Sequence, residues 1–481
     1  MAPLHTSPLA FKFCGLAVLC ACAAAVPAAV PAAVPAAVPA YADNPPPENP
    51  ATGNNSPEAQ VQGKKGEENN DKKLLGDIGG LRPAIATYGF DFKASETDEI
   101  LGNISGGLRR GAIYDGLTDI SLKFDLRKYF DWRGVFYARA FQIHGRGLSA
   151  NYLDNLITAS SIEADRSTRL SELWYEQHIG DWLRIRVGQQ GADQEFLVST
   201  TAKLFVNSTF GWPTLEGIVL PSGGPAYPLS TPALRFRIDA SDALTFFAAA
   251  FNGNPAGPGP GDPQLRDASG TAFRTGDGVL AFFEARYNPE NSTKNGTYRL
   301  GAWFNSERFA DRHVDSNGVS LASPLSTGTP RLLGNDYSLY AIVDQPLFPD
   351  KDSDNGFSAF VRAMGAPGDR NLVDFYFDTG LVYKGPFGRD DDAVGIGYGY
   401  ARIGNAARLL DQDTAGAAAY PTRSRETVLE ISYQYQATPW WQLQPDFQYV
   451  TNPGGGILNP TVLGQKVGNA AIFGLRTAIT F

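Results

Sequence analysis

The chain of 481 residues is short of thiols, of charge and of long apolar runs. Its three cysteines, Cys14, Cys20 and Cys22, all lie near the N-terminus, so no disulfide can form downstream of them. Charged residues make up 19% of the chain, less than the roughly 25% of ordinary soluble proteins. Beyond residue 42 no apolar run approaches the about 20 residues that a membrane helix needs. These absences argue against a disulfide scaffold and against a bundle of transmembrane helices.

Aromatic residues are plentiful, with 29 Phe, 20 Tyr and 7 Trp. So many large apolar side chains exclude disorder for most of the chain. The formal net charge of -9 argues against a protein that binds nucleic acid through a basic surface. We therefore expect a large folded protein without a nucleic-acid partner.

The N-terminal region has the pattern of an export signal. The uncharged segment 13–42 is largely apolar and ends in an A-x-A cleavage site at 40–42. Prolines recur at every fourth position within it and would break a membrane helix. We expect residues 1–42 to be a cleaved signal peptide, and the alternative is a lipoprotein acylated at Cys22.

The next segment, 43–75, is expected to be a linker. It is rich in proline, asparagine and charged residues, and it has no apolar face to bury. Such a composition is typical of disorder. The remaining residues, 76–481, then form the folded domain.

From about residue 81 onward, apolar and polar residues alternate with a period of two, which is typical of β-strands. In the segment 441–450, for example, Leu443 and Phe447 alternate with Gln444 and Gln448. Sixteen candidate strands follow from this pattern. They lie near 82–92, 117–127, 132–141, 170–178, 182–188, 233–239, 244–251, 279–287, 297–305, 336–345, 357–365, 372–383, 392–402, 425–437, 441–450 and 470–481.

The connections between these strands differ in length in a regular way. Connections after even-numbered strands are mostly short and those after odd-numbered strands mostly long, as at 93–116, 189–232 and 306–335. A soluble sandwich has the same alternation within its strands, but it has no reason to place its long loops at one end. Outer-membrane barrels do so, with short periplasmic turns and long external loops. We therefore predict an all-β fold, a transmembrane antiparallel β-barrel of about 16 strands.

The last candidate strand ends on an aromatic residue. Phe473, Leu475 and the terminal Phe481 share its apolar face, and Arg476 lies on the other face. A C-terminal aromatic on a lipid-facing side resembles the signature that the outer-membrane assembly machinery reads. We therefore expect this machinery to be a partner through Phe481.

Seven short segments carry a resemblance to a known family. They are Leu75–Arg82, 170–174, Phe210–Pro213, Gly223–Pro228, 251–262, 383–392 and 444–455. In this order they resemble the carbohydrate-selective porins of the OprB type, from about residue 75 to the C-terminus. The resemblance implies a barrel in the bacterial outer-membrane lipid through which sugars such as monosaccharides diffuse passively into the periplasm. The alternatives are a general porin, a porin that prefers organic anions, and a structural or adhesive barrel.

A channel for sugars needs polar partners for hydroxyl groups and aromatic rings for the apolar faces of the sugar. The hairpin 170–188 supplies both on one face, which we place in the lumen because charges facing lipid would cost roughly 2–4 kcal/mol each. A turn at Ile179–Asp181 would pair Glu176 with Arg184 and Trp174 with Arg186. The candidate pore-lining residues are Glu172, Trp174, Glu176, Arg184, Arg186, Arg235 and Arg237. The alternative role for the charged members is to brace the barrel wall.

The longest expected connection, 189–232, is the third external loop. In porins generally the third loop folds inward and narrows the channel, so the resemblance implies a constriction here. The candidate constriction residues are Asp193, Glu195, Lys203 and Trp212. The alternative is a loop that lies over the mouth of the barrel.

Motifs for catalysis or metal binding are not found in the sequence. The aspartates at 350–354 lack the spacing of a calcium loop, and His144, His178 and His313 show no ligand spacing. No nucleophile or phosphate-loop motif occurs. We therefore expect no enzymatic activity, no cofactor and no metal.

Overall fold

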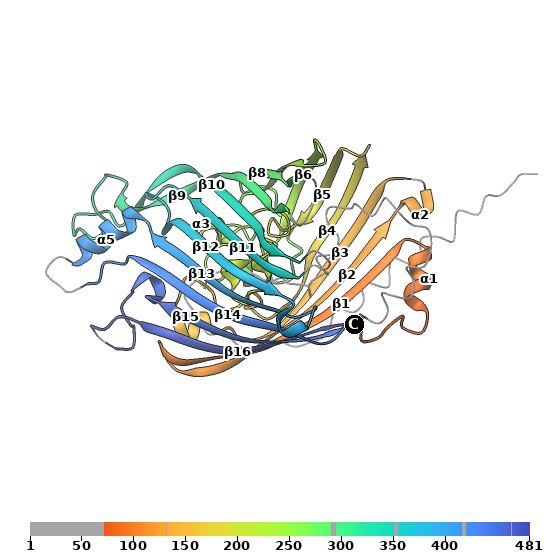
Figure 1. Ribbon diagram of the computed structural model, residues 1–481. Coiled ribbons are helices and arrows are strands. Elements are labelled where there is room, and N and C mark those ends of the chain that lie inside the picture. The colour runs from red at the N-terminus through yellow and green to blue at the C-terminus, as the bar shows by residue number, and fades with distance from the viewer. Residues whose placement is uncertain (1–71, 131, 290–294, 351–354, 416–419, 463) are drawn as a thin grey trace, which may run out of the picture. The chain divides into compact units, whose positions relative to one another are not determined.

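The computed structural model describes residues 72–481, apart from 131, 290–294, 351–354, 416–419 and 463. Within them each of sixteen antiparallel strands pairs with its sequence neighbours, and β16 pairs with β1 to close a barrel (Figure 1). The expected fold class is therefore confirmed. The expected signal peptide and nearly all of the expected linker lie outside the described residues, so these two boundaries stay predictions.

The strand bounds match most of the sixteen candidate segments. The strands are β1 (Phe90–Gly107), β2 (Gly111–Asp125), β3 (Gly134–Gly145), β4 (Ser167–Ile179), β5 (Leu183–Gln190), β6 (Thr231–Asp239), β7 (Leu244–Asn252), β8 (Val279–Tyr287), β9 (Thr297–Asp315), β10 (Pro330–Pro349), β11 (Gly356–Gly365), β12 (Val373–Lys384), β13 (Ala393–Ile403), β14 (Arg425–Thr438), β15 (Trp441–Thr451) and β16 (Gly468–Thr480).

Helices are few and short in the described part of the chain. They are α1 (Leu81–Thr87), α2 (Arg127–Phe130), α3 (Thr214–Val219), α4 (Pro263–Arg266) and α5 (Asn405–Ala415). None of these described helices has the length and the apolar character to cross a membrane.

The expected first strand at 82–92 is wrong. Residues Leu81–Thr87 form α1, and β1 begins only at Phe90. The expected long connection 93–116 is also wrong, because it consists mostly of β1 and β2 themselves. The alternation in β1 is hidden because acidic residues occupy two outward positions, Glu96 and Asp98, on the same face as the exposed Ile100.

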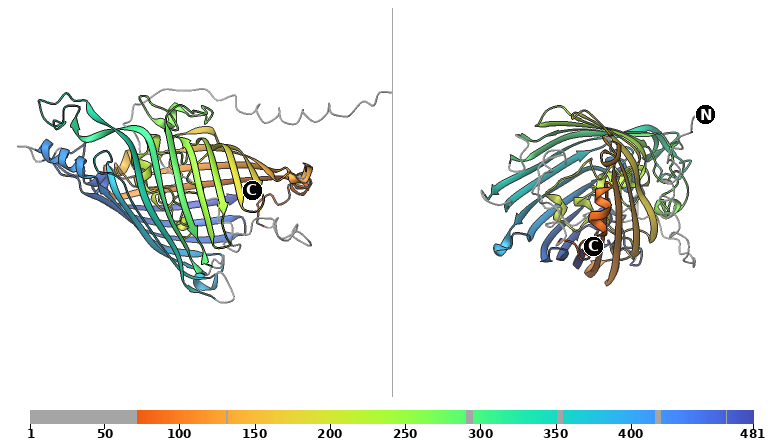
Figure 2. Two further views of the ribbon diagram at one scale, coloured as in Figure 1. Left: turned by 90° about the horizontal axis from the view of Figure 1, so that it is seen from above. Right: turned by 90° about the vertical axis from the view of Figure 1, so that its right-hand side faces the viewer.

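The expected connection 306–335 is likewise too long, because β9 extends to Asp315 and β10 begins at Pro330, and the other connections follow the expected pattern. The long ones, 146–166, 191–230, 253–278 and 404–424, follow odd-numbered strands and leave the sheet at one end of the barrel, which we call the long-loop end. Figure 1 shows α5 at this end, whereas α1 and the C-terminus lie at the opposite, short-turn end. Figure 2 gives a view from the short-turn end, in which the strands surround the interior.

The two faces of the strands have opposite character. Outward side chains are apolar and exposed, as Leu300 and Leu339 show, each with 67% of its surface accessible. Inward side chains such as Arg476, Gln448 and Glu430 are polar and buried. The carboxyl-terminal residue is held at the barrel's seam, since the Phe481 N–H donates to the Ala94 carbonyl oxygen at 2.9 Å. The alternation that the sequence predicts is therefore the difference between the outer and inner faces of the barrel.

The connection 191–230, which we call the inner loop, lies inside the barrel. Figure 1 shows its helix α3 surrounded by strands. Its main contact is Arg362 of β11, whose guanidinium donates to the carbonyl oxygens of Leu197 at 2.9 Å, Thr209 at 2.7 Å and Gly211 at 2.7 Å. The same guanidinium is paired with Asp378 of β12, and both side chains are fully buried. One cation thus fixes three carbonyl groups of the inner loop.

Inward-facing carboxylates bind the amide groups of the same loop. Asp344 of β10 accepts from the Thr201 N–H at 3.1 Å, and Glu430 of β14 accepts from the N–H groups of Val206 at 2.6 Å and Asn207 at 3.0 Å. Buried backbone groups need such partners, because an unpaired N–H in the interior is costly. The barrel wall therefore satisfies the irregular backbone that it encloses.

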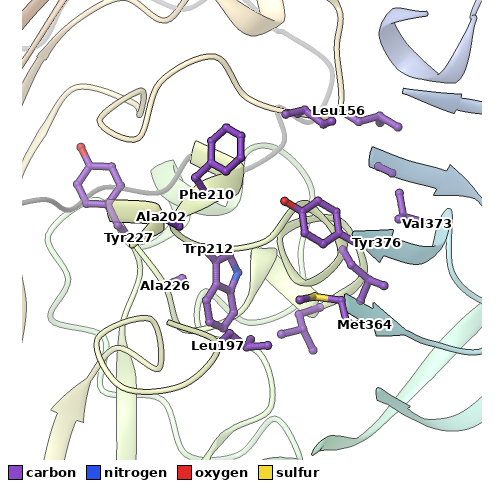
Figure 3. Close-up of a cluster of buried hydrophobic side chains, with 14 of the residues drawn as sticks. Leu156, Leu197, Ala202, Phe210, Trp212, Ala226, Tyr227, Met364, Val373 and Tyr376 are labelled. Carbon is purple, nitrogen blue, oxygen red and sulfur yellow. The ribbon is translucent and has the colours of Figure 1, made fainter. Parts of the chain in front are cut away.

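Apolar side chains fill the space between the inner loop and the same wall. Figure 3 shows Phe210 and Trp212 of the loop in one cluster with Tyr376 and Met364, which extend from neighbouring strands. The wall makes room for this packing with glycine. A Cβ at Gly397 of β13 would lie 2.7 Å from the Phe210 ring, closer than van der Waals contact permits.

Arg362→Met should release the inner loop from the wall. The substitution removes three hydrogen bonds to loop carbonyls and leaves the Asp378 carboxylate buried without its ion-pair partner. Breaking a buried pair in this way lowers the free energy of unfolding by about 3–5 kcal/mol. We expect new protease cleavage within 191–230 and a larger single-channel conductance in planar bilayers.

Arg402→Met is the matched control. Arg402 also pairs with an aspartate, Asp374, at 2.7 Å, but 48% of its side chain is exposed. Exposed pairs contribute little to stability, so this variant should behave as the wild type. If Arg362→Met resists protease and conducts as the wild type does, the anchoring role of Arg362 is wrong.

Candidate functional site

The hairpin β4–β5 places its charged residues on the inner face, but its register differs from the expected one. Glu176 pairs with Arg186, and Trp174 pairs with Gly188. The expected pairs Glu176–Arg184 and Trp174–Arg186 are therefore wrong. A shift of two residues leaves every side chain on the same face, so the residues expected to face the lumen do lie on the inward side.

The turn explains the difference in register. It consists of residues 180–182 and not Ile179–Asp181, because β4 continues to Ile179, which pairs with Leu183. Gly180 has a φ of +57°, a left-handed conformation that glycine adopts without strain. The turn therefore begins at the glycine, and the pairing of the hairpin follows from that position.

Trp174 is the centre of an aromatic and cationic group on the inner wall. The ring of Tyr137 on β3 stacks against it, with 4.8 Å between centroids and 25° between planes. The Arg186 guanidinium lies 4.0 Å from the indole centroid, and the indole N–H donates to Glu172 at 2.8 Å. Because β3 and β5 flank β4, Tyr137 and Arg186 approach the indole from opposite sides. Trp174 therefore holds Arg186 in place, and the guanidinium covers one of the indole faces.

A network of ion pairs joins this group to the inner loop. Glu176 accepts from Arg186 Nε at 3.0 Å and from Arg235 Nη2 at 2.7 Å. Glu195 of the inner loop lies 2.7 Å from Arg235 and 3.5 Å from Arg186. Burial alone would raise the pKa of Glu195, but the positive charges of Arg235 and Arg186 lower it below its usual value. Glu195 is thus a charged bridge between the loop and the wall.

Toward the short-turn end the inner wall continues with partly exposed cations. Arg237 pairs with Asp239 at 2.9 Å, and Arg184 lies 3.8 Å from the same carboxylate. Arg286 of β8 lies 4.0 Å from the centroid of the Phe247 ring. The side chains of Arg184, Arg237 and Arg286 are 17%, 21% and 24% exposed. These groups can exchange hydrogen bonds with a solute in the lumen.

The four candidates on the inner loop have different environments. Glu195 belongs to the network described above. Asp193 is buried, and it accepts from the Tyr227 N–H at 3.0 Å. Trp212 is 4% exposed and donates to the Gly223 carbonyl oxygen, so it packs within the loop and does not face the lumen. Lys203 is exposed on a short helical turn, Ala202–Leu204.

We call the inner face of β3–β8 the arginine-rich wall, and several of its residues are not among the candidates from the sequence. Arg286 and Glu284 lie on the polar face of the candidate strand 279–287, so the alternation already marked them. Phe247 lies in a strand with apolar residues on both faces, where the pattern cannot tell inside from outside. Tyr137 could be recognised only from its pairing with Trp174.

The structure is a closed antiparallel barrel of sixteen strands whose third connection at the long-loop end, the inner loop, lies inside the lumen, and this architecture is typical of outer-membrane porins. The family model for the carbohydrate-selective porin, OprB family, matches residues 109–481. The chain belongs to this family. It is therefore a carbohydrate-selective porin of the bacterial outer membrane, which confirms the resemblance, the location and the sugar-admitting function expected from the sequence.

Known proteins resemble the chain over most of its length. Porin B of Pseudomonas aeruginosa is 25% identical over 436 residues, which cover 86% of this chain and 92% of that protein. A putative porin of Acinetobacter baylyi, QuiX, is 22% identical and covers 85% of the chain. The high-pH structure of Pseudomonas putida OprB matches with a TM-score of 0.75 at 23% identity, over 86% of this chain and 99% of that one. This last match supports the fold.

Glu216 of α3 is a buried carboxyl group that links the inner loop to β9. One of its oxygens accepts from the Trp303 indole N–H at 3.0 Å, and the other has no hydrogen-bond partner among the described residues. Burial raises the pKa of Glu216 to about 7, although the hydrogen bond from Trp303 and the charge of Arg362 act in the opposite direction. The neutral form is therefore the one that the folded loop favours.

The inner loop should be more stable at pH 5 than at pH 8. Neutral Glu216 contributes to the free energy of unfolding of the loop. This contribution is complete below the ordinary pKa of 4.5 and is lost as the pH rises through about 7, which changes the free energy of unfolding by about 3 kcal/mol. Hydrogen exchange of the amides in 208–220, corrected for the intrinsic rate, should therefore quicken at pH 8. Glu216→Gln should remove most of this change, with the amides of β13 as an internal reference. Equal protection at both pH values in the wild type would contradict this role.

Proposed function

We propose that sugars cross the barrel between the inner loop and the inner face of β3–β8, and that this passage is the constriction of the channel. The observation that supports the proposal is the contrast between the two walls. Inward side chains on β10–β15 are buried under the inner loop, whereas Tyr137, Trp174, Arg184, Arg186 and Arg237 remain partly exposed. Water and solutes then reach the arginine-rich wall.

The chemistry of that wall suits a hydroxyl-rich solute. Guanidinium groups donate and carboxylates accept hydrogen bonds, so together they replace the water that a sugar loses. The stacked rings of Tyr137 and Trp174 give an apolar surface beside these groups. Arg186 covers the indole, so we assign the direct polar contacts to Arg186, Arg184 and Arg237, and a positioning role to Trp174.

The charge balance of the wall favours an uncharged solute over an organic anion. Arg139 of β3 is paired with Asp119 of β2, and around Trp174 and Phe247 five further arginines lie among five carboxylates. They are Arg184, Arg186, Arg235, Arg237 and Arg286, with Glu172, Glu176, Glu195, Asp239 and Glu284. Since the charges nearly cancel, the wall offers hydrogen bonds without a strong potential of one sign.

Two further parts of the proposal concern export and assembly. We propose that residues 1–42 are removed as a signal peptide and that 43–75 links the export signal to the barrel. We also propose that the assembly machinery recognises the last strand through Phe481. The outward position of Phe473 and Leu475 on the same strand supports this proposal. Cells that produce the Phe481→Ala variant should contain less folded barrel in the outer membrane than cells that produce the wild type.

Arg186→Ala and Trp174→Ala should change how sugars block the ion current. Loss of one polar contact or of the aromatic support changes binding by about 0.5–1.5 kcal/mol, so we expect the blocking constant for glucose to change about two- to tenfold. The control is Arg127→Ala, whose side chain pairs with Asp125 in a turn at the short-turn end. Unchanged block in both variants would exclude these residues from the sugar path. Glucose flux into liposomes no faster than into protein-free vesicles would contradict the channel function itself.

The wild-type channel should discriminate little between small anions and cations. In a tenfold gradient of potassium chloride we expect a reversal potential near zero, because the charges of the wall are balanced. Glu195→Gln removes one negative charge beside Arg235 and Arg186 and should shift the channel toward anions. Strong anion selectivity of the wild type would favour the alternative of an organic-anion porin.

A further inference from the structure

Three ligand-type side chains converge on the outward face of the barrel, outside the channel. They are Glu96 and Asp98 of β1 and His144 of β3, which we call the outer cluster. Glu96 and Asp98 lie four and two positions before Ile100, so they occupy the same face of β1 as Ile100, whose side chain is exposed on the outer surface. β2 lies between the two strands, and Gly116 of β2 pairs with both Asp98 and His144. The cluster is thus built by the barrel and not by a loop.

The spacing of the outer cluster fits a small metal ion. His144 Nε2 lies 3.7 Å from a Glu96 oxygen and 3.6 Å from an Asp98 oxygen. All the candidate ligand atoms lie within 4.8 Å of one another. Nitrogen and oxygen ligands bound to Zn²⁺ at about 2.0–2.2 Å are about 3.4 Å apart in a tetrahedral site. The two distances from His144 are within a few tenths of an ångström of this value, and the two carboxylate side chains can turn to complete the geometry around an ion.

The imidazole is oriented for this role by its neighbours. Its ring lies over Gly116, where a Cβ would come within 2.1 Å of Nε2. On its other side Nδ1 lies 2.9 Å from the Gln142 side-chain oxygen, which accepts a hydrogen bond and so places the proton on Nδ1. A second partner of this kind is typical of histidines that bind metal through the remaining nitrogen. The lone pair of Nε2 then faces the two carboxylates.

Nε2 faces three oxygen atoms, and this arrangement suits a cation. The third oxygen is the Tyr114 hydroxyl, 3.0 Å from Nε2. Its proton is donated to Asp98 at 2.5 Å, so it does not serve the histidine. A proton or a metal ion can lie between Nε2 and the oxygens.

The surroundings favour a divalent ion over a proton between Nε2 and the carboxylates. Along β1 the cluster is followed by Ile100 and Ile104, whose side chains are 58% and 50% exposed on the outer face. Charge is costly on the lipid-facing side of a barrel. Two carboxylates and a neutral imidazole around a divalent ion have no net charge.

We propose that Glu96, Asp98 and His144 bind a divalent transition-metal ion, with Zn²⁺ as the probe, on the outer face of the barrel. Imidazole and carboxylate ligands suit Zn²⁺. Three protein ligands leave one tetrahedral position, which is filled by water or by the Tyr114 hydroxyl. The site is separate from the sugar path, so its function does not depend on the proposed channel mechanism.

The test uses the untagged full-length porin, purified in detergent and treated with a chelator. Calorimetric titration with Zn²⁺ should give one site per chain, and Co²⁺ should give visible absorption bands of a four-coordinate ion. His144→Gln and Asp98→Asn should each weaken Zn²⁺ binding at least tenfold and abolish the Co²⁺ bands. Heat-modifiable migration in gels verifies that each variant keeps the folded barrel.

His313→Gln is the matched control. His313 also lies beside a carboxylate, Asp413, at 2.7 Å, but in the long-loop end and outside the outer cluster. This variant should bind Zn²⁺ as the wild type does. Absence of stoichiometric Zn²⁺ binding to the folded wild type would overturn the proposal, and so would equal binding by His144→Gln.

Discussion

An irregular segment enclosed by a barrel must find hydrogen-bond partners that no neighbouring strand can supply. The rest of this structure depends on that constraint, because water is largely excluded between the inner loop and the wall. Arg362 supplies donors to three loop carbonyls, and Asp344 and Glu430 accept from loop amides. The connection 146–166 follows the same rule, since Glu426 accepts from the N–H groups of Leu156 and Ile157. Inward-facing ionisable residues thus serve first as partners for the backbone.

The anchoring of the loop divides the lumen into two unequal sides. Apolar contacts such as that between Phe210 and the glycine at 397 close the space against β11–β15. On the other side the loop meets the wall through Glu195, which forms a charged bridge to Arg235 and Arg186. The same residue types therefore have two functions. Arg362 is fully buried and structural, whereas Arg237 is partly exposed and available to a solute.

Alternation could predict which face of a strand each residue occupies, but not which residues meet across the barrel. The period of two does not change when the register shifts by two residues. The sequence therefore predicts the correct face for Glu176 and Arg186, although it does not predict that they pair with each other. Contacts of the inner loop join residues far apart in the chain, such as Thr209 and Arg362, and no local pattern reveals them. For the same reason the sequence predicts Trp212 as a constriction residue, whereas in the structure Trp212 is buried within the loop.

The free-energy cost of placing a charge next to lipid explains which residues lie on the inner and outer faces of the barrel. It places the arginines of β4–β6 in the lumen, where water and carboxylates surround them. It also makes Glu96 and Asp98 exceptional, because they stand on the opposite face and interrupt the alternation of β1. Along β1 the polar pattern is not repeated, since Ile100 and Ile104 continue the apolar surface, whereas Thr118 of β2 and Gln142 of β3 are polar neighbours on the same face. A divalent cation would compensate this pair of carboxylates, and the imidazole of His144, turned toward them across Gly116, is arranged to share it.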